Sequence, residues 1–444
     1  MNYQQTILNE ISCSGTGIHS GKKVSMKIKP AKANTGIVFT RIDIDSKPKI
    51  EAKLDNIFDT FRSTKIKKNN YSIMTIEHFC AACFALSIDN LNIDIDSEEL
   101  PILDGSSKLY IDLLLNAGVK KLEKKTQKIK LNRYIKVTNK LSTIEYFPSD
   151  NLEFTVNIDY NSDVLLKQKA ILKNLNDFKL EIAPAKTFCF FKKIDDLKNK
   201  GLIQGGSLNN TIIFLEKNSK NNKFKKGILN KESITFDNEP ARHKLLDLIG
   251  DLSLIGQKIS GKIIANKPGH LINIKFAKEL YKIMKKTNKV PSINFQEKPL
   301  MDLDKIKKIL PHREPFLLID EIRELNENHV IGVKYVKKEE DYFRGHFPGE
   351  PVMPGVLQIE AMAQTGGILA LSTVPDPENY LTYFMKINNV KFKRKVIPGD
   401  VIIFELELVA PIRRGICQMN GRGYVGENVV IEAELMAKID KEDR

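Results

Sequence analysis

The stretch "EPARHKLLDLIGDL", residues 239–252, sets polar side chains among leucines and isoleucines in a way that burial alone does not explain. His243 and Asp247 are four positions apart, and at about 100° per residue they lie only about 40° apart around a helix. An imidazole and a carboxylate on one helix face can reach the same cation, so the spacing predicts a helix that carries part of a metal site. The same spacing is found as often in a simple polar pair, so a metal site is indicated only if the chain supplies further ligands.

A third metal ligand has to come from elsewhere in the chain, because catalytic zinc usually takes three protein ligands and keeps one position for water. His78, in "SIMTIEHFCAACFALSIDN", is the ligand that we expect. Glu77 precedes it and therefore projects from a different side, near the metal but free to accept a proton as general base. His270, in the loop "KPGH", could supply the hydrogen-bond donor opposite.

Eight short segments extend this pattern, in the order "GTGIHSGKKV", "ANTGIVFTR", "TIEHF", "ELPILDGSS", "APAKTF", "GGSLNN", "ARHKLLDLIGDL" and "PGHLIN". They resemble the zinc-dependent UDP-3-O-acyl-N-acetylglucosamine deacetylases of lipid A synthesis over about residues 4 to 285. The resemblance implies roles for six residues: the zinc ligands His78, His243 and Asp247, the base Glu77, the acid His270 and the oxyanion donor Thr187.

The same resemblance implies UDP-3-O-((3R)-hydroxyacyl)-N-acetylglucosamine as the substrate and Zn²⁺ as the cofactor. It also implies two domains of similar sandwich topology, residues 1–122 and 127–285, with the zinc site between them. Asp251 would orient the catalytic histidine. Three further positions match residues that contact the substrate, namely Phe188, Lys244 and Lys267.

Two departures from the family pattern concern the nucleotide end of the substrate rather than the chemistry. Lys186 stands where an arginine is expected in "APAKTF", and the segment "FRSTKIKKNN" is basic and loop-like. His19 in "GTGIHSG" is explained equally well as a turn histidine bonded to the backbone and as a contact to the nucleotide.

A second motif, "DYFRGHFPGEPVMPGVLQIEAMAQ", holds His346 in a Gly/Pro loop before a helical pattern with one acidic residue, Glu360. A carboxylate among apolar neighbours is costly to bury unless it is paired or functional. Elimination of water from a β-hydroxyacyl thioester needs a base, an acid and a donor to the thioester carbonyl. His346, Glu360 and the N-terminus of the helix can supply all three. Gly355 would let a ligand approach the first free N–H groups of that helix.

This part of the chain, for which we expect a domain at residues 301–444, resembles the (3R)-hydroxyacyl-acyl-carrier-protein dehydratases of the hotdog fold over about residues 301 to 441. The segments that carry the resemblance are "ILPHREPFLLID", "GHFPGEPVMPGVLQIEAMAQTGG", "YFMKINNVKFKRKVIPGD" and "RRGICQMNGRGYVGE". The resemblance implies homodimers in which His346 of one chain faces Glu360 of the other, with three such pairs in a hexamer. His312 in "LPHREPF" is interpreted as a structural member of its motif.

An acidic acyl carrier protein is the partner that this resemblance implies. The basic run "KFKRK", Lys391–Lys395, together with Arg413 and Arg414, could be its landing patch. An ordinary solvated sheet edge explains the same residues equally well.

The length and patterning predict several domains of class α+β, since 444 residues exceed what one hydrophobic core organises. We expect an N-terminal pair of two-layer α/β sandwich domains and a C-terminal hotdog domain, a long central helix wrapped by an antiparallel sheet. Pro291 and Pro299 interrupt polar sequence and place a linker at residues 286–300.

The bulk composition favours a soluble cytoplasmic enzyme. Five scattered cysteines fit a reducing compartment, and no apolar run is long enough to cross a bilayer. The net charge of +15 is not accompanied by a nucleic-acid-binding motif, so we expect no nucleic-acid partner.

The sequence therefore predicts a bifunctional enzyme, a zinc-dependent deacetylase joined to a dehydratase of fatty acid synthesis. The alternatives for the last part are a hotdog thioesterase and a non-catalytic scaffold that binds a carrier protein. The histidine loop "GHFPGEPVMPG" argues against the first, and complete catalytic sets in both parts argue against the second.

Overall fold

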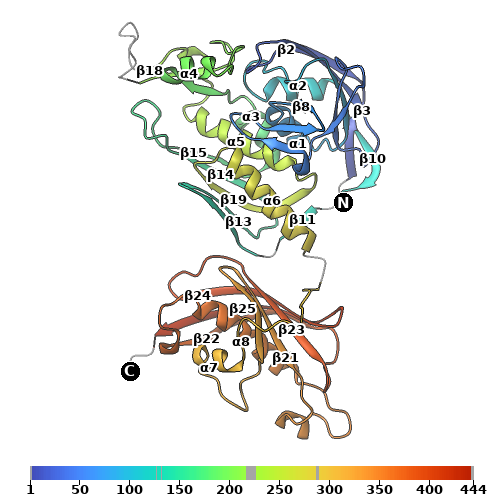
Figure 1. The fold of residues 1–444 in the computed structure, drawn as a ribbon, viewed down its shortest axis with the longest axis vertical. Helices are drawn as coiled ribbons and strands as arrows, with labels where there is room; N and C mark the ends of the chain where they lie inside the picture. Colours follow the sequence, from blue (N-terminus) through green and yellow to red (C-terminus); the bar gives the residue numbers. More distant parts are fainter. Residues whose placement is uncertain (1–2, 127, 132, 217–226, 287–289, 442–444) are drawn as a thin grey trace. The chain divides into compact units, whose positions relative to one another are not determined.

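The computed structural model describes residues 3–441 except 127, 132, 217–226 and 287–289. The chain forms two compact units, one of residues 1–130 and 136–285 and the other of residues 131–135 and 286–444 (Figure 1). Among the described residues, no helix combines the length and apolar character that a membrane span requires.

The first unit is built around two sheets that share one strand order. The first sheet runs β2 (Ile11–Thr16), β3 (Lys23–Pro30), β9 (Leu91–Ile95), β4 (Ile37–Arg41), β5 (Lys49–Glu51). The second runs β12 (Ile135–Asn139), β13 (Ser142–Phe147), β19 (Lys258–Asn266), β14 (Leu152–Ile158), β15 (Gln168–Leu172). In both sheets the strand that comes last along the chain lies in the centre. Among the five strands named for each sheet it forms the one parallel pair, β9 with β4 and β19 with β14.

Each central strand is also flanked along the chain by two helices. Helices α1 (Glu77–Ala85) and α2 (Lys108–Asn116) precede and follow β9, and helices α5 (Glu239–Ser253) and α6 (His270–Lys286) precede and follow β19. Figure 1 shows α1, α5 and α6 between the two sheets. Every side chain from Glu77 to Cys83 in α1 is buried, and all five cysteines of the chain are free.

Short elements complete the first unit. Strand β1 (Tyr3–Ile7) pairs with β10 (Val119–Lys125), and β11 (Lys128–Lys130) pairs with β19. Two small sheets consist of β6 (Ile57–Asp59), β7 (Lys65–Lys68) and β8 (Tyr71–Ile73), and of β16 (Phe188–Phe190), β17 (Ile212–Leu215) and β18 (Gly227–Ile228). Helices α3 (Phe178–Glu181) and α4 (Ile194–Asn199) are also short.

Helix α5 begins where the sequence places a residue that can bind several N–H groups. The carboxylate of the fully buried Glu239 accepts hydrogen bonds from the backbone nitrogens of Lys186 (2.9 Å), Thr235 (2.5 Å) and Phe236 (3.2 Å). Pro240 sits in the first turn, where a missing N–H costs no helical bond. The helix predicted from the spacing of His243 and its neighbours is therefore fixed at its start.

The second unit is one antiparallel sheet against a long helix. The strand order is β20 (Glu321–Asn326), β21 (His329–Tyr335), β23 (Val401–Leu408), β24 (Ile416–Val425), β25 (Asn428–Lys441), β22 (Tyr380–Phe392). Helix α8 (Gly355–Leu371) packs on the sheet through buried residues such as Met362 and Ile368, and α7 (Leu303–Ile309) joins the same core. The antiparallel sheet around a long helix confirms the predicted fold class.

The segment that the sequence predicts as a linker makes defined contacts inside the second unit. Val290 and Ile293 pack against the buried cluster of Ile331, Ile403 and Tyr424. The ring of Phe295 lies 6.5 Å from that of Tyr335, and the guanidinium of Arg323 lies 5.2 Å from the centre of Phe295. Val290 and Ile293 thus border this buried cluster, while the side chain of Phe295 is 45% exposed.

Candidate functional site

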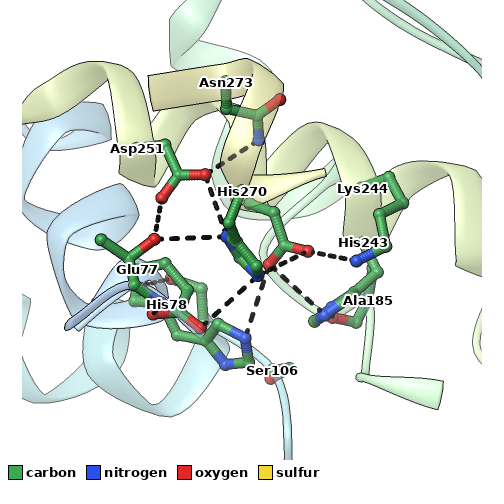
Figure 2. Close-up of polar contacts among 12 residues, drawn as sticks. Glu77, His78, Ser106, Ala185, His243, Lys244, Asp251, His270 and Asn273 are labelled. Atoms are coloured by element: carbon green, nitrogen blue, oxygen red, sulfur yellow. Dashed lines mark hydrogen bonds and ion pairs between the residues drawn. The ribbon is translucent and has the colours of Figure 1, made fainter. Parts of the chain in front are cut away.

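Helices α1 and α5 bring one buried cluster of possible metal ligands together. His78 from α1 and His243 and Asp247 from α5 each offer one ligand atom, and these atoms all lie within 4.8 Å of one another. Asp247 Oδ1 is 3.7 Å from Nε2 of His78 and 3.5 Å from Nε2 of His243. Figure 2 shows the side chains of His78 and His243 close to each other.

The atoms of this cluster fit a cation. Oδ1 of Asp247 is buried and has no hydrogen-bond partner among the described residues, while its Oδ2 accepts a bond from Lys244 Nζ at 2.7 Å. Nδ1 of His243 lies 3.1 Å from the carbonyl oxygen of Ala185, which turns Nε2 towards the centre. Burial and the neighbouring His243 lower the pKa of His78 to about 3, so its imidazole is neutral and can act as a ligand.

Two titratable side chains, Glu77 and His270, flank the cluster. Nε2 of His270, at the start of α6, is 3.9 Å from Glu77 Oε1 and 3.9 Å from Asp247 Oδ2. Burial raises the pKa of Glu77 to about 7. Burial also disfavours the charged form of His270, but the carboxylates of Asp251 and Asp247 outweigh it and raise the pKa of His270 to about 9. The site therefore holds a carboxyl group and a cationic imidazole side by side.

The orientation of His270 depends on a residue one turn beyond the ligands. Nδ1 of His270 lies 2.9 Å from Asp251 Oδ2, which also accepts a hydrogen bond from Asn273 Nδ2 at 2.9 Å (Figure 2). Because Nδ1 is held by a carboxylate, Nε2 is the ring nitrogen that faces Glu77. The structure places Asp251 where the family resemblance predicts an orienting aspartate.

Sequence reasoning missed one residue of this site. Thr64 is fully buried, its hydroxyl donates to Asp251 Oδ1 at 2.5 Å, and its backbone N–H donates to Glu77 Oε2 at 3.1 Å. It lies in "FRSTKIKKNN", which the sequence suggested to be only a basic loop. No spacing connects it to Asp251, which is 187 positions away, so nothing in the sequence alone points to it.

A cavity of about 710 Å³ borders the cluster of possible metal ligands at His78. Its lining brings together Glu77, His78 and His270 with the four other predicted residues, Thr187, Phe188, Lys244 and Lys267. His19 also lines it, while the backbone N–H of His19 is held by Glu99 Oε1 at 2.9 Å. These contacts are compatible with both explanations of His19. The backbone N–H of Lys186 donates to the carboxylate of Glu239 and not to a group in the cavity.

In the second unit, the described lining of the cavity at Glu360 does not include His346. Glu360 lines a cavity of about 290 Å³, and its other lining residues include His312, Phe316 and Gln364. His346 is not among the described lining residues, and its Nδ1 lies 2.8 Å from the carbonyl oxygen of Val352.

The carboxylate of Glu360 is held by two neighbours. Gln364 Nε2 donates to Glu360 Oε1 at 2.9 Å, and His312 Nε2 lies 3.4 Å from the same oxygen. Burial alone would raise the pKa of Glu360, but these two contacts lower it below its usual value. The structure thus places His312 in contact with a predicted catalytic group, beyond the structural role expected for it.

Gly355 packs against an aromatic ring, a contact that the sequence did not reveal. A Cβ at this position would lie 2.7 Å from the ring of Phe392, so only glycine lets that ring pack against the start of α8. The ring of Phe392 thus lies close to the start of α8 at Gly355.

His329, Glu405 and Glu407 form a second group whose atoms could hold a metal. Both ring nitrogens of His329 already face carboxylates, with Nδ1 at 3.3 Å from Glu324 and Nε2 at 3.3 Å from Glu405. Burial disfavours the charged ring, but these carboxylates raise the pKa of His329 to about 9. The geometry fits an imidazolium ion pair better than a metal ligand.

The two units define a metal-dependent hydrolase joined to a hotdog-fold enzyme. Residues 4–282 match the family "UDP-3-O-acyl N-acetylglycosamine deacetylase", and residues 310–434 match the "FabA-like domain". The chain belongs to the family of bifunctional LpxC/FabZ enzymes, and it carries a metal-dependent deacetylase and a dehydratase.

Similar proteins support this over the whole chain. The bifunctional enzyme LpxC/FabZ of Bacteroides thetaiotaomicron is 42% identical over 99% of this chain and 99% of its own length. That of Porphyromonas gingivalis is 41% identical with the same coverage. The UDP-3-O-acyl-N-acetylglucosamine deacetylase of Chlamydia pneumoniae is 37% identical over 62% of this chain and 96% of its own length. These matches confirm the predicted fusion.

Proposed function

We propose that the first unit removes the N-acetyl group of UDP-3-O-((3R)-hydroxyacyl)-N-acetylglucosamine, and that the second dehydrates (3R)-hydroxyacyl-acyl-carrier protein to the trans-2-enoyl product. The names of the relatives and the two families matched support these substrates. The observation that carries the first assignment is the buried ligand cluster with Glu77 and His270 beside it. We also infer that the enzyme works in the cytoplasm, an inference supported by the scattered, free cysteines.

Zn²⁺ is the metal that we propose for the cluster of His78, His243 and Asp247. Two imidazoles and one carboxylate are a donor set typical of catalytic zinc, and the unpartnered Oδ1 of Asp247 supports it. When bound there, zinc supplies a water of lowered pKa and polarises the substrate carbonyl.

The residues around the cluster would divide the proton transfers between them. Glu77 accepts the proton of the attacking water, since its carboxylate faces the cluster and is held by the Thr64 N–H. His270 donates a proton from Nε2 to the leaving amine, because Nδ1 is engaged by Asp251. The hydroxyl of Thr187 donates a hydrogen bond to the oxyanion as it forms.

The rest of the cavity would hold the remainder of the substrate. Phe188 offers an aromatic face, and Lys244 Nζ lies 5.7 Å from its ring centre while also binding Asp247. Lys267 lines the same cavity, and its Nζ lies 3.2 Å from Asp159 Oδ2. The charge of Lys267 is therefore partly balanced when no anionic substrate is bound. We assign the two lysines to the nucleotide phosphates.

The dehydratase site would be composite, with His346 from one chain and Glu360 from its partner. The surface supports pairing, because strand β22 is an edge of the sheet and carries exposed apolar side chains at Tyr383, Phe384 and Met385. An unpaired edge with exposed apolar residues is a surface that a second copy can cover. A hexamer of three such pairs follows from the family resemblance.

Acyl carrier protein is the partner that we propose for the second unit. Within the basic run, Lys393 pairs with Glu432 at 2.9 Å and Lys395 with Glu350 at 2.6 Å, which reduces the net charge of the patch. The remaining attraction to an acidic carrier would come from the rest of the run with Arg413 and Arg414.

Mass spectrometry of products from the purified chain tests both activities at once. With both substrates present, we expect acetate and an enoyl thioester. Glu77→Gln should remove the acetate alone and Glu360→Gln the enoyl product alone, so the product that each variant still forms reports the amount of chain present. A wild-type chain that formed neither product would favour a carrier-binding scaffold.

A further inference from the structure

Thr64 connects the two proton-transfer groups of the first unit through two separate donors. It lies between β6 and β7, immediately before Lys65, and none of its surface is exposed. Its backbone N–H reaches Glu77 Oε2 at 3.1 Å, and its hydroxyl reaches Asp251 Oδ1 at 2.5 Å.

The direction of the hydroxyl bond follows from the donors available. A threonine hydroxyl has one hydrogen, and the ionised carboxylate of Asp251 can only accept. Oδ2 of Asp251 already takes His270 Nδ1 and Asn273 Nδ2, so the hydroxyl hydrogen belongs to Oδ1. Nδ1 of His270 is also 3.3 Å from Thr64 Oγ1, which can only accept from it. Both contacts therefore favour the same ring orientation, with Nε2 turned towards Glu77.

The backbone bond has a matching effect on Glu77. With Oε2 held by the Thr64 N–H, the other oxygen, Oε1, is the one that lies 3.9 Å from His270 Nε2. One buried residue thus fixes which oxygen of the carboxylate and which nitrogen of the imidazole face each other.

We propose that Thr64 is a positioning residue of the deacetylase, acting on His270 through Asp251 and on Glu77 through its backbone. This inference rests on the roles proposed above for Glu77 and His270. Thr64 contacts none of the proposed zinc ligands in the hydrogen bonds described, so its effect is on proton transfer and not on metal binding. Its β-branched side chain restricts the rotamer, which keeps the hydroxyl aimed at Asp251.

The test compares three variants of the full-length zinc-loaded chain. Thr64→Val removes the hydroxyl but keeps the shape and the backbone N–H, and Thr64→Ser keeps the hydroxyl. Ser63→Ala is the matched control, because Ser63 is equally buried and its hydroxyl has no hydrogen-bond partner among the described residues. We measure kcat and KM for deacetylation, zinc content, the dehydration rate as a reference for the amount of chain, and the side-chain positions in crystals of each variant.

We expect Thr64→Val to lower kcat on the order of 10- to 100-fold with little change in KM, as is typical when a group that orients an active-site residue is lost. Zinc content and dehydration should stay at wild-type levels, and Asp251 and His270 should be displaced in the crystal. Thr64→Ser should recover most of the rate, and Ser63→Ala should match the wild type.

Two results would overturn the proposal. Loss of zinc in Thr64→Val, with Ser63→Ala intact, would show that Thr64 has a structural role only. An unchanged kcat in Thr64→Val would also overturn the proposal, provided that Asp251→Asn is strongly impaired. If Asp251→Asn and His270→Gln were also unimpaired, the function proposed for the site would itself be wrong, so the two failures are distinguishable.

Discussion

Gly250 of α5 lies directly against the backbone of Glu77 in α1, and a Cβ at Gly250 would be 2.2 Å from the Glu77 carbonyl oxygen. Glycine at this point is what allows the two ligand-bearing helices to approach so closely. The contact also sets the positions of Glu77 and His78 relative to His243 and Asp247.

We therefore expect Gly250→Ala to damage the site from a distance. The added methyl group meets backbone atoms that cannot move aside cheaply, so unfolding should be easier by about 1 to 3 kcal/mol. Deacetylation and zinc content should both fall, while dehydration persists. Ser253→Ala, on the same helix and partly buried, is the control, because it removes only a hydroxyl that donates to the Gly250 carbonyl and adds no atom to the helix contact. A Gly250→Ala chain with full zinc content and activity would contradict this account of the helix contact.

Removal of the metal should separate the two activities. The described ligand cluster of the first unit is buried and has an unpartnered oxygen, whereas Glu360 is held by Gln364 and His312 without a metal. Dialysis against a strong chelator should abolish deacetylation and leave dehydration intact, and added Zn²⁺ should restore the lost rate. Equal loss of both activities would contradict independent sites.

The contacts of residues 290–297 determine where the chain can be divided. Val290 and Ile293 among them pack against Ile331, Ile403 and Tyr424, and the carbonyl of Glu297 accepts a hydrogen bond from Arg323 at 2.7 Å. A fragment that starts at Val290 should therefore keep dehydratase activity and melt several degrees above one that starts at Leu300. Differential scanning calorimetry measures this, and equal melting temperatures would mean that the segment is a free tether.

The sequence predicts those parts of the molecule that depend on local rules. Helical spacing identifies α5, and strand alternation with a long helix identifies the class of the second unit. Motif resemblance supplies the ligand set and the pair of His346 and Glu360. The comparisons confirm the family and both activities, whereas the role of each residue stays a proposal.

Other parts cannot be read from the sequence, because they depend on contacts between distant segments. Thr64 meets Asp251 across 187 positions, and the space beside Gly355 is filled by Phe392. The repeated topology of the first unit is also hidden, since the shared property is strand order and each strand needs only an alternating pattern. The position of His346 away from the cavity at Glu360 appears only in the structure.

The ion pairs of His329 predict a pH dependence for the second unit. The carboxylates of Glu324 and Glu405 outweigh burial and raise the pKa of His329 to about 9, above its ordinary value. A group whose pKa is raised in the folded state stabilises fully below its unfolded pKa of about 6.5, and that stabilisation is lost as the pH rises through about 9. The loss should be about 1 to 3 kcal/mol.

Heat inactivation of dehydration between pH 6 and pH 10 measures this effect. The wild type should lose thermal stability over the upper part of that range, and His329→Gln should give a flatter profile that starts lower. Deacetylation in the same chain is the reference for general alkaline damage. Parallel profiles for the two proteins would show that His329 is not the responsible group.

The arrangement of His346 and Glu360 predicts that two inactive chains can restore each other. His346 does not line the cavity at Glu360 among the described residues, so each complete site would draw its histidine from one chain and its carboxylate from the other. His346→Ala and Glu360→Ala chains should each be inactive as dehydratases. When they are mixed and subunits exchange, half of the pairs are mixed, and each mixed pair has one intact site and one site with both lesions.

Random exchange of equal amounts should therefore restore about a quarter of wild-type dehydration. Subunit exchange is followed separately with two fluorescent labels, and deacetylation, which neither substitution touches, reports the amount of folded chain. A Glu360→Ala chain mixed with the double variant His346→Ala/Glu360→Ala is the negative control, because no pair in that mixture contains an intact Glu360. If exchange is complete and dehydration stays at the level of the single variants, both residues act within one chain and the composite site is wrong.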